Sequence, residues 1–184
     1  MIQLAISGAC QQMDDTRGAM DAFQEIFQHG QAAGNSVYEL LGVSGMALMA
    51  IRRGRLHFAF DLASQGIARV ERTGSMPPVS TAVYGELGTI LYQWHQLEQA
   101  HAYFQKAIQV SVLSGHSDAK LFYGVILSRL HQIEGDLEAA AREIEEAVGL
   151  MQVVAATVVR DEVIAQQVRI DLARDRLAAA EAAL

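Results

Sequence analysis

The stretch that decides the fold is Tyr84-Gly85-Glu86-Leu87-Gly88-Thr89-Ile90-Leu91-Tyr92-Gln93-Trp94-His95-Gln96-Leu97-Glu98-Gln99-Ala100. Its apolar and small residues recur every three or four positions, which is the period of a helix and not the alternation of a strand. A break at 94–96 interrupts the pattern, so the stretch predicts two helices joined by a turn. One such hairpin cannot bury its own apolar stripe, and it must therefore stack on further copies.

The same frame recurs along the chain with a period of about 40 residues, in the range of helical repeats. Four copies carry a leucine followed three residues later by an alanine, the leucines being Leu56, Leu97, Leu137 and Leu177. A glycine ends three of the units, where the last turn of a helix needs a left-handed residue: Gly34, Gly74 and Gly115. We expect an all-α, right-handed superhelix of about five helix hairpins. It would form a single repeat domain over residues 1–184, with hairpins near 2–33, 36–73, 77–114, 117–152 and 155–184, the last one incomplete.

The best copy resembles the tetratricopeptide (TPR) repeat. It has that repeat's order of aromatic, small and apolar positions in Tyr84, Leu87, Gly88, Leu91, Leu97, Ala100, Phe104 and Ala107. The period is longer than the roughly 34 residues of a usual TPR, and HEAT-like repeats share the longer period. The alanine after each turn favours TPR. The resemblance implies a concave surface lined by the first helix of each hairpin.

A narrower resemblance covers roughly residues 42–112. The segments 84–100 and 54–59 are similar to signature segments of the large ATP-dependent LuxR-type transcriptional activators, the family of the maltose-regulon activator. In that family a nucleotide-binding domain precedes the TPR superhelix, and a helix-turn-helix domain follows it. The resemblance therefore implies that this chain is a fragment of a larger regulator. ATP would bind the missing N-terminal domain, and DNA would be bound only through the missing helix-turn-helix domain.

Charge and cysteine content indicate which kinds of partner the chain can bind and in which compartment of the cell it works. The chain has 14 Lys and Arg against 21 Asp and Glu, a formal charge of -7, which argues against a direct nucleic-acid or membrane interface. A lone cysteine, Cys10, cannot form an intramolecular disulfide, and the N-terminus lacks the pattern of a signal peptide. These features predict a cytoplasmic protein.

The sequence contains no recognisable catalytic or metal-binding motif. It has neither a GxxxxGK[ST] phosphate loop nor a GxGxxG loop, so no cofactor is expected to bind this chain. None of the six histidines forms an HxxxH or HExxH pair, which argues against a metal site. We therefore expect a non-enzymatic chain. An acidic run over 134–146 is more typical of a solvated helix face than of a docking site.

The candidate binding site lies on the first helices of the hairpins. Threading the repeat over the sequence places seven polar or aromatic residues on the concave surface: Arg52, Thr89, Tyr92, Gln93, Arg129, Gln132 and Arg169. Amides and guanidinium groups bind hydroxyls, carboxylates and phosphates, and an aromatic ring stacks on sugars or apolar groups. The same composition also fits a groove that is polar only because water fills it, and that alternative stays open.

The resemblance implies a sensor or interaction domain of a LuxR-type regulator. A small-molecule inducer or a regulatory protein bound in the groove would control self-association and so transcription. The alternative is a general TPR scaffold for protein–protein interaction with no role in transcription.

Overall fold

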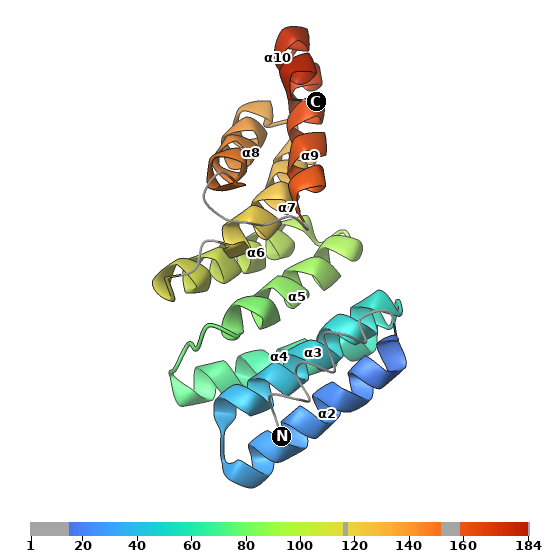
Figure 1. Ribbon diagram of the computed structural model, residues 1–184, viewed down its shortest axis with the longest axis vertical. Helices are drawn as coiled ribbons and strands as arrows, with labels where there is room; N and C mark the ends of the chain where they lie inside the picture. Colours follow the sequence, from blue (N-terminus) through green and yellow to red (C-terminus); the bar gives the residue numbers. More distant parts are fainter. Residues whose placement is uncertain (1–14, 116–117, 152–158, 184) are drawn as a thin grey trace. The chain divides into compact units, whose positions relative to one another are not determined.

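The computed structural model describes residues 15–115, 118–151 and 159–183, and all regular secondary structure in these ranges is α-helical (Figure 1). The part of the first expected hairpin, near 2–33, that precedes residue 15 lies outside the described residues. The helices are α2 (Thr16–Ala33), α3 (Ser36–Arg52), α4 (Leu56–Thr73), α5 (Ser80–Gln93), α6 (Leu97–Leu113), α7 (Asp118–Glu134), α8 (Leu137–Met151), α9 (Arg160–Ala173) and α10 (Leu177–Ala182).

The helix ends follow from local chemistry that the sequence displays. Gly34, Gly74 and Gly115 have φ angles of 61°, 63° and 75°, so the predicted left-handed residues are confirmed. At the start of α3, the Asn35 side-chain oxygen accepts hydrogen bonds from the backbone N–H groups of Val37 and Tyr38, at 3.1 and 3.2 Å. These bonds satisfy donors that a helix leaves unpaired in its first turn.

The chain divides into two compact units, residues 1–110 and residues 111–184, called unit 1 and unit 2 below. The boundary falls inside α6, so unit 1 contains α2 to α5 and most of α6, and unit 2 contains α7 to α10. Whether the repeats form a single domain stays a prediction.

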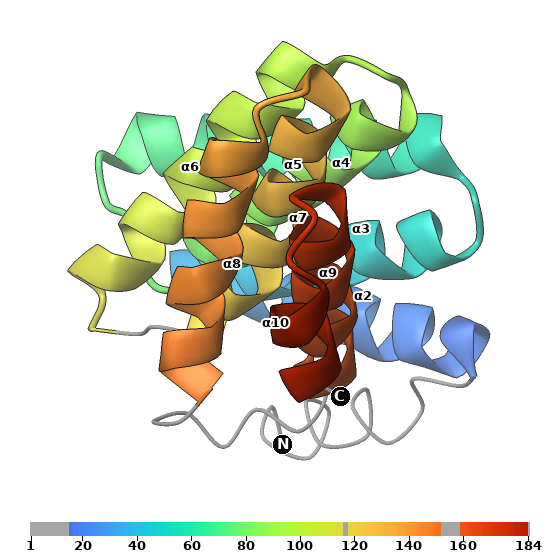
Figure 2. The ribbon, with the colours of Figure 1, turned by 90° about the horizontal axis from the view of Figure 1, so that it is seen from above.

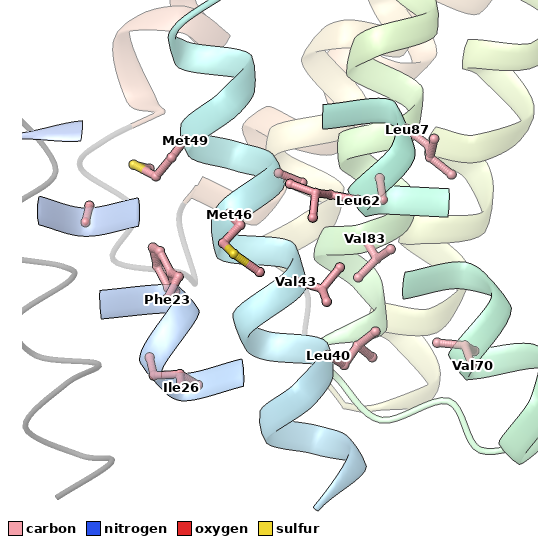
Figure 3. Close-up of a cluster of buried hydrophobic side chains, with 13 residues drawn as sticks. Phe23, Ile26, Leu40, Val43, Met46, Met49, Leu62, Val70, Val83 and Leu87 are labelled. Carbon is pink, nitrogen blue, oxygen red and sulfur yellow. The ribbon is translucent and has the colours of Figure 1, made fainter. Parts of the chain in front are cut away.

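In unit 1 the two kinds of helix are buried to different extents. Nine of the 17 residues of α3 and nine of the 14 residues of α5 are buried, against five of the 18 residues of α4. Figure 3 shows the reason: side chains of α3 meet Phe23 and Ile26 of α2 on one side, and Leu62 and Val83 of α4 and α5 on the other. In unit 1 the first helices α3 and α5 are therefore covered on most of their surface, whereas the second helix α4 is amphipathic.

The contact between α2 and α3 depends on positions that have no side chain. A Cβ atom on Gly42 would lie 2.6 Å from the backbone nitrogen of Phe27, and one on Gly45 would lie 2.1 Å from the Phe23 ring. Both distances are below 3.0 Å, which non-bonded contacts of real Cβ atoms essentially never reach, so glycine is required for the two helices to approach this closely.

In unit 2, α7, α8 and α9 pack against one another, and α10 packs on α9 (Figure 2). Their shared core contains Leu121 of α7, Ile144 of α8 and Val163 of α9, each at most 1% exposed. Consecutive first helices, α7 and α9, contact each other directly as α3 and α5 do in unit 1.

The glycine contacts generate a prediction for stability. Gly42→Ala should lower the free energy of unfolding by about 1–3 kcal/mol, because the added methyl group meets backbone that cannot move aside. Gly124→Ala is the matched control in α7, since its Cβ would meet its nearest neighbours at 3.7 and 3.9 Å, which are ordinary contacts. The control should be neutral or more stable by up to about 1 kcal/mol. Urea unfolding followed by circular dichroism measures both, and equal midpoints for the two variants would contradict the packing described.

Candidate binding surface

The seven residues of the predicted groove are divided between the two units. Unit 1 holds the four on α3 and α5, which are Arg52, Thr89, Tyr92 and Gln93. Unit 2 holds the three on α7 and α9, which are Arg129, Gln132 and Arg169. A single groove that contains all seven stays a prediction, and each group is described within its own unit.

In unit 1 the four residues differ in how far they are available to a ligand. Arg52 and Gln93 are exposed, whereas Thr89 and Tyr92 are half-buried. The Thr89 hydroxyl donates to the carbonyl oxygen of Gly85 at 2.9 Å, one turn earlier in α5. Because this bond uses the hydroxyl proton, Thr89 can offer a ligand only an acceptor.

In unit 2 one guanidinium is held across neighbouring first helices. Arg129 of α7 donates from Nη2 to Oε2 of Glu162 on α9 at 3.5 Å, and both side chains are partly exposed. The repeat register predicts guanidinium groups that project from the first helices, and Arg129 is one of these with a carboxylate partner inside unit 2. Arg169 is exposed on the same helix as Glu162 and forms no ion pair among the described residues.

A buried amide lies beside this pair and was missed by the sequence reasoning. The Gln166 side-chain nitrogen donates to Oε1 of Gln132 at 3.1 Å and to the hydroxyl of Ser128 at 3.3 Å. Ser128 in turn donates to the carbonyl oxygen of Ala140 at 2.9 Å. The predicted site residue Gln132 is thus tied to a network that joins α7, α8 and α9. Gln166 itself is fully buried, and its Oε1 has no partner among the described residues.

Unit 1 contains a counterpart of Gln166 two repeat periods earlier. Glu86 occupies the equivalent position of another first helix, α5, and is also buried. Its Oε1 accepts a hydrogen bond of 2.7 Å from the Ser44 hydroxyl on α3, while its Oε2 has no partner among the described residues. Burial raises the pKa of the Glu86 carboxyl well above its usual range, and the Ser44 hydrogen bond only partly opposes this.

The repeat register was the signal that could have identified both residues. A polar side chain at the same position of two first helices falls between consecutive first helices in each unit. Each one forms a hydrogen bond with a serine of the preceding first helix, and this bond favours one register of a hairpin against the next. The first helices therefore contain buried polar side chains that the apolar pattern of the sequence does not reveal.

Several acidic side chains of the run over 134–146 form ion pairs within unit 2. Arg174 Nη2 lies 3.0 Å from both carboxylate oxygens of Glu138. Arg176 Nη1 lies 3.8 Å from Oε1 of Glu145. Lys120 pairs with Glu146. The run is therefore an internally paired surface, which agrees with its interpretation as a solvated helix face.

The described residues contain no group of three or more metal-ligating side chains. Within the same ranges, no helix is both long and apolar enough to cross a membrane.

Glu86 generates a prediction about pH. The folded state holds the proton more tightly than the unfolded state, so the stabilisation is complete below the unfolded-state pKa near 4.5 and is lost as pH rises toward the raised folded pKa. In that window the free energy of unfolding should fall by up to about 1.4 kcal/mol per pH unit. Glu86→Gln keeps the acceptor for Ser44 and removes the titration. As pH rises, the free energy of unfolding of the variant should therefore increase relative to that of the wild type.

Urea unfolding followed by Trp94 fluorescence, at steps between pH 4.5 and 8.5, measures this difference. Glu98→Gln, which removes an exposed carboxyl of α6, is the control and should leave the pH dependence unchanged. Parallel curves for the wild type and Glu86→Gln would show that Glu86 is not neutral in the folded state.

The fold has well-matched counterparts among solved structures. BtubC (BKLC) from P. vanneervenii superposes with a TM-score of 0.79 at 18% identity, covering 95% of this chain and 72% of that chain. The TPR-like repeats of a putative kinesin light chain from Podosopora anserina give 0.68 at 17% identity, covering 99% and 92%. MamA protein gives 0.59 at 13% identity, covering 99% and 87%. These likenesses show a TPR-like α-α superhelical repeat fold.

No curated protein matches the chain. The family described as the MalT-like TPR region matches over residues 1–184. The resemblance to TPR repeats of this type is confirmed, and the fold is typical of a non-catalytic scaffold for protein interaction. The chain belongs to the family of MalT-like TPR regions.

Proposed function

We propose that the chain is the sensor domain of a LuxR-type, ATP-dependent transcriptional regulator in the cytoplasm. An inducer or a regulatory protein would bind the surface formed by the first helices and change self-association. ATP binding and DNA binding would belong to other domains of the full-length protein. The observation that carries the proposal is the family match over residues 1–184.

The chemistry of unit 2 supports a polar ligand. Arg129 is only half-buried, and its pairing with Glu162 at 3.5 Å is long for a charged hydrogen bond, so the guanidinium retains donors for a ligand. Gln132 lies one turn along α7 on the same side, with its oxygen held by Gln166 and its amide nitrogen available. A guanidinium beside an amide is suited to carboxylates, phosphates or clustered hydroxyls.

A general interaction scaffold remains the alternative function. It is favoured by the TPR-like repeat fold itself, which serves protein interaction. The two functions differ in one measurable respect, because only a sensor should change its self-association when a small ligand binds.

The test starts from defined probes. Neutral sugars, sugar phosphates and dicarboxylates are screened by the shift they cause in the melting temperature, and each compound that binds is measured by calorimetry and by sedimentation velocity. Arg129→Ala should weaken binding by about 1.5–3 kcal/mol, the range of a charged hydrogen bond. Its melting temperature should hardly change, since a partly exposed ion pair contributes about 1 kcal/mol or less.

Arg142→Ala is the control, because Arg142 is exposed on the second helix α8 and carries the same charge. It should bind like the wild type. Equal affinities of Arg129→Ala and wild type would remove Arg129 from the site. Binding without any change in sedimentation would favour the scaffold over the sensor.

A further inference from the structure

A second surface of unit 1 is formed at the turn between α3 and α4. Residues 51–60 contain three arginines and no acidic residue, in a chain whose formal charge is -7. Gly54 turns the chain with a φ of 69°, and the flanking Arg53 and Arg55 are both exposed. Positive charge is therefore concentrated at one hairpin turn.

Both guanidinium groups are held in place by their surroundings. Arg53 donates from Nε to the Thr16 hydroxyl of α2 at 2.9 Å. The Arg55 guanidinium carbon lies 4.7 Å from the centre of the Phe58 ring, which is a cation–π distance. Their positions are thus set before any partner arrives, and this lowers the entropy cost of binding.

Aromatic rings continue the surface toward the next hairpin turn. The ring of His57 lies 5.0 Å from the ring of Trp94, the residue that follows α5, and Phe60 packs 5.3 Å from the same indole. His57 is exposed, and 39% of Phe58 is accessible. We call Arg53, Arg55, His57, Phe58 and Trp94 the turn surface.

Among the residues that the structure describes, no acidic side chain forms an ion pair with the arginines of the turn surface. By contrast, Arg174 and Arg176 of unit 2 each meet acidic side chains. Asp15, which precedes Thr16 in the chain, caps the start of α2, where its Oδ1 accepts from the N–H groups of Arg17 and Gly18 at 3.1 Å. Each guanidinium keeps N–H donors for a partner.

We propose that the turn surface binds an acidic segment of another protein. Guanidinium groups pair with carboxylates in a bidentate geometry, and the accessible part of the Phe58 side chain adds apolar contact for a neighbouring side chain. Nucleic acid is disfavoured because binding it requires many neutralised phosphates, and the turn surface offers only the two guanidinium groups of Arg53 and Arg55. A second copy is disfavoured because the acidic face of its α8 already pairs with Lys120, Arg174 and Arg176. The proposal is independent of the groove function.

The experiment uses the full chain and a hexaglutamate peptide that carries a fluorescent label. Fluorescence anisotropy measures its affinity at two salt concentrations, and the emission of Trp94, the single tryptophan, reports binding at the turn surface. Binding should weaken as salt rises, because exposed charges are screened. Arg53→Gln combined with Arg55→Gln should weaken it at least tenfold and abolish the change in Trp94 emission.

The matched control is Arg72→Gln combined with Lys106→Gln, which removes the same two charges from other parts of unit 1. It should bind within about twofold of wild type, since neither residue belongs to the turn surface and exposed charges act weakly at a distance. Phe58→Ala, which leaves both arginines, is a second test and should weaken binding several-fold. Circular dichroism melting of every variant establishes that it is folded.

Three outcomes would overturn the proposal. The first is a wild-type chain that does not bind the peptide. The second is an equal loss of peptide affinity in the arginine pair and in its control. The third is tighter binding of a short single-stranded oligonucleotide than of hexaglutamate at the turn surface. Self-association that disappears in the arginine variant would instead identify a second copy as the occupant.

Discussion

The close approach of each first helix to its neighbours is the constraint on which unit 1 depends. At Gly42 and Gly45 of α3, and at Gly88 of α5, an added Cβ would lie 2.1 to 2.7 Å from atoms of the neighbouring helix. Contacts this short leave no room for a side chain, so helix spacing is set by the absence of one. Once the spacing is fixed, the apolar stripes interdigitate and each first helix becomes covered on several sides.

This covering has a chemical consequence. Helices that are buried on several sides contain few positions for polar groups, and those that occur must find partners inside. Glu86 and Gln166 satisfy this requirement in part, each by bonding a serine on the preceding first helix. Each also retains one oxygen without a partner among the described residues. In each unit the contact between consecutive first helices therefore contains a buried polar side chain that is only partly satisfied, and in unit 2 this side chain lies beside Gln132, one of the residues proposed to bind a ligand.

Much of the fold was accessible from the sequence, because the features that determine it are local or periodic. Leucine anchors at a constant spacing located the second helices, and Gly34, Gly74 and Gly115 marked helix ends through backbone conformation alone. The candidate site was less accessible, since it depends on which side chains of different hairpins meet. The pairing of Arg129 with Glu162 and the burial of Gln166 follow from the stacking of α9 on α7, which belong to different hairpins. The internal pairing of the acidic run likewise depends on arginines of the next hairpin, Arg174 and Arg176.

Hydrogen exchange of backbone amides, resolved by helix, tests most directly whether the first helices of unit 1 are buried on several sides. If first helices are covered on several sides, the central amides of α3 and α5 should exchange only through global opening of unit 1, and they should be the slowest in it. The amphipathic helices α2 and α4 should exchange faster, through local opening. Equal protection of α3 and α4, or faster exchange in α3 and α5 than in α4, would contradict the account.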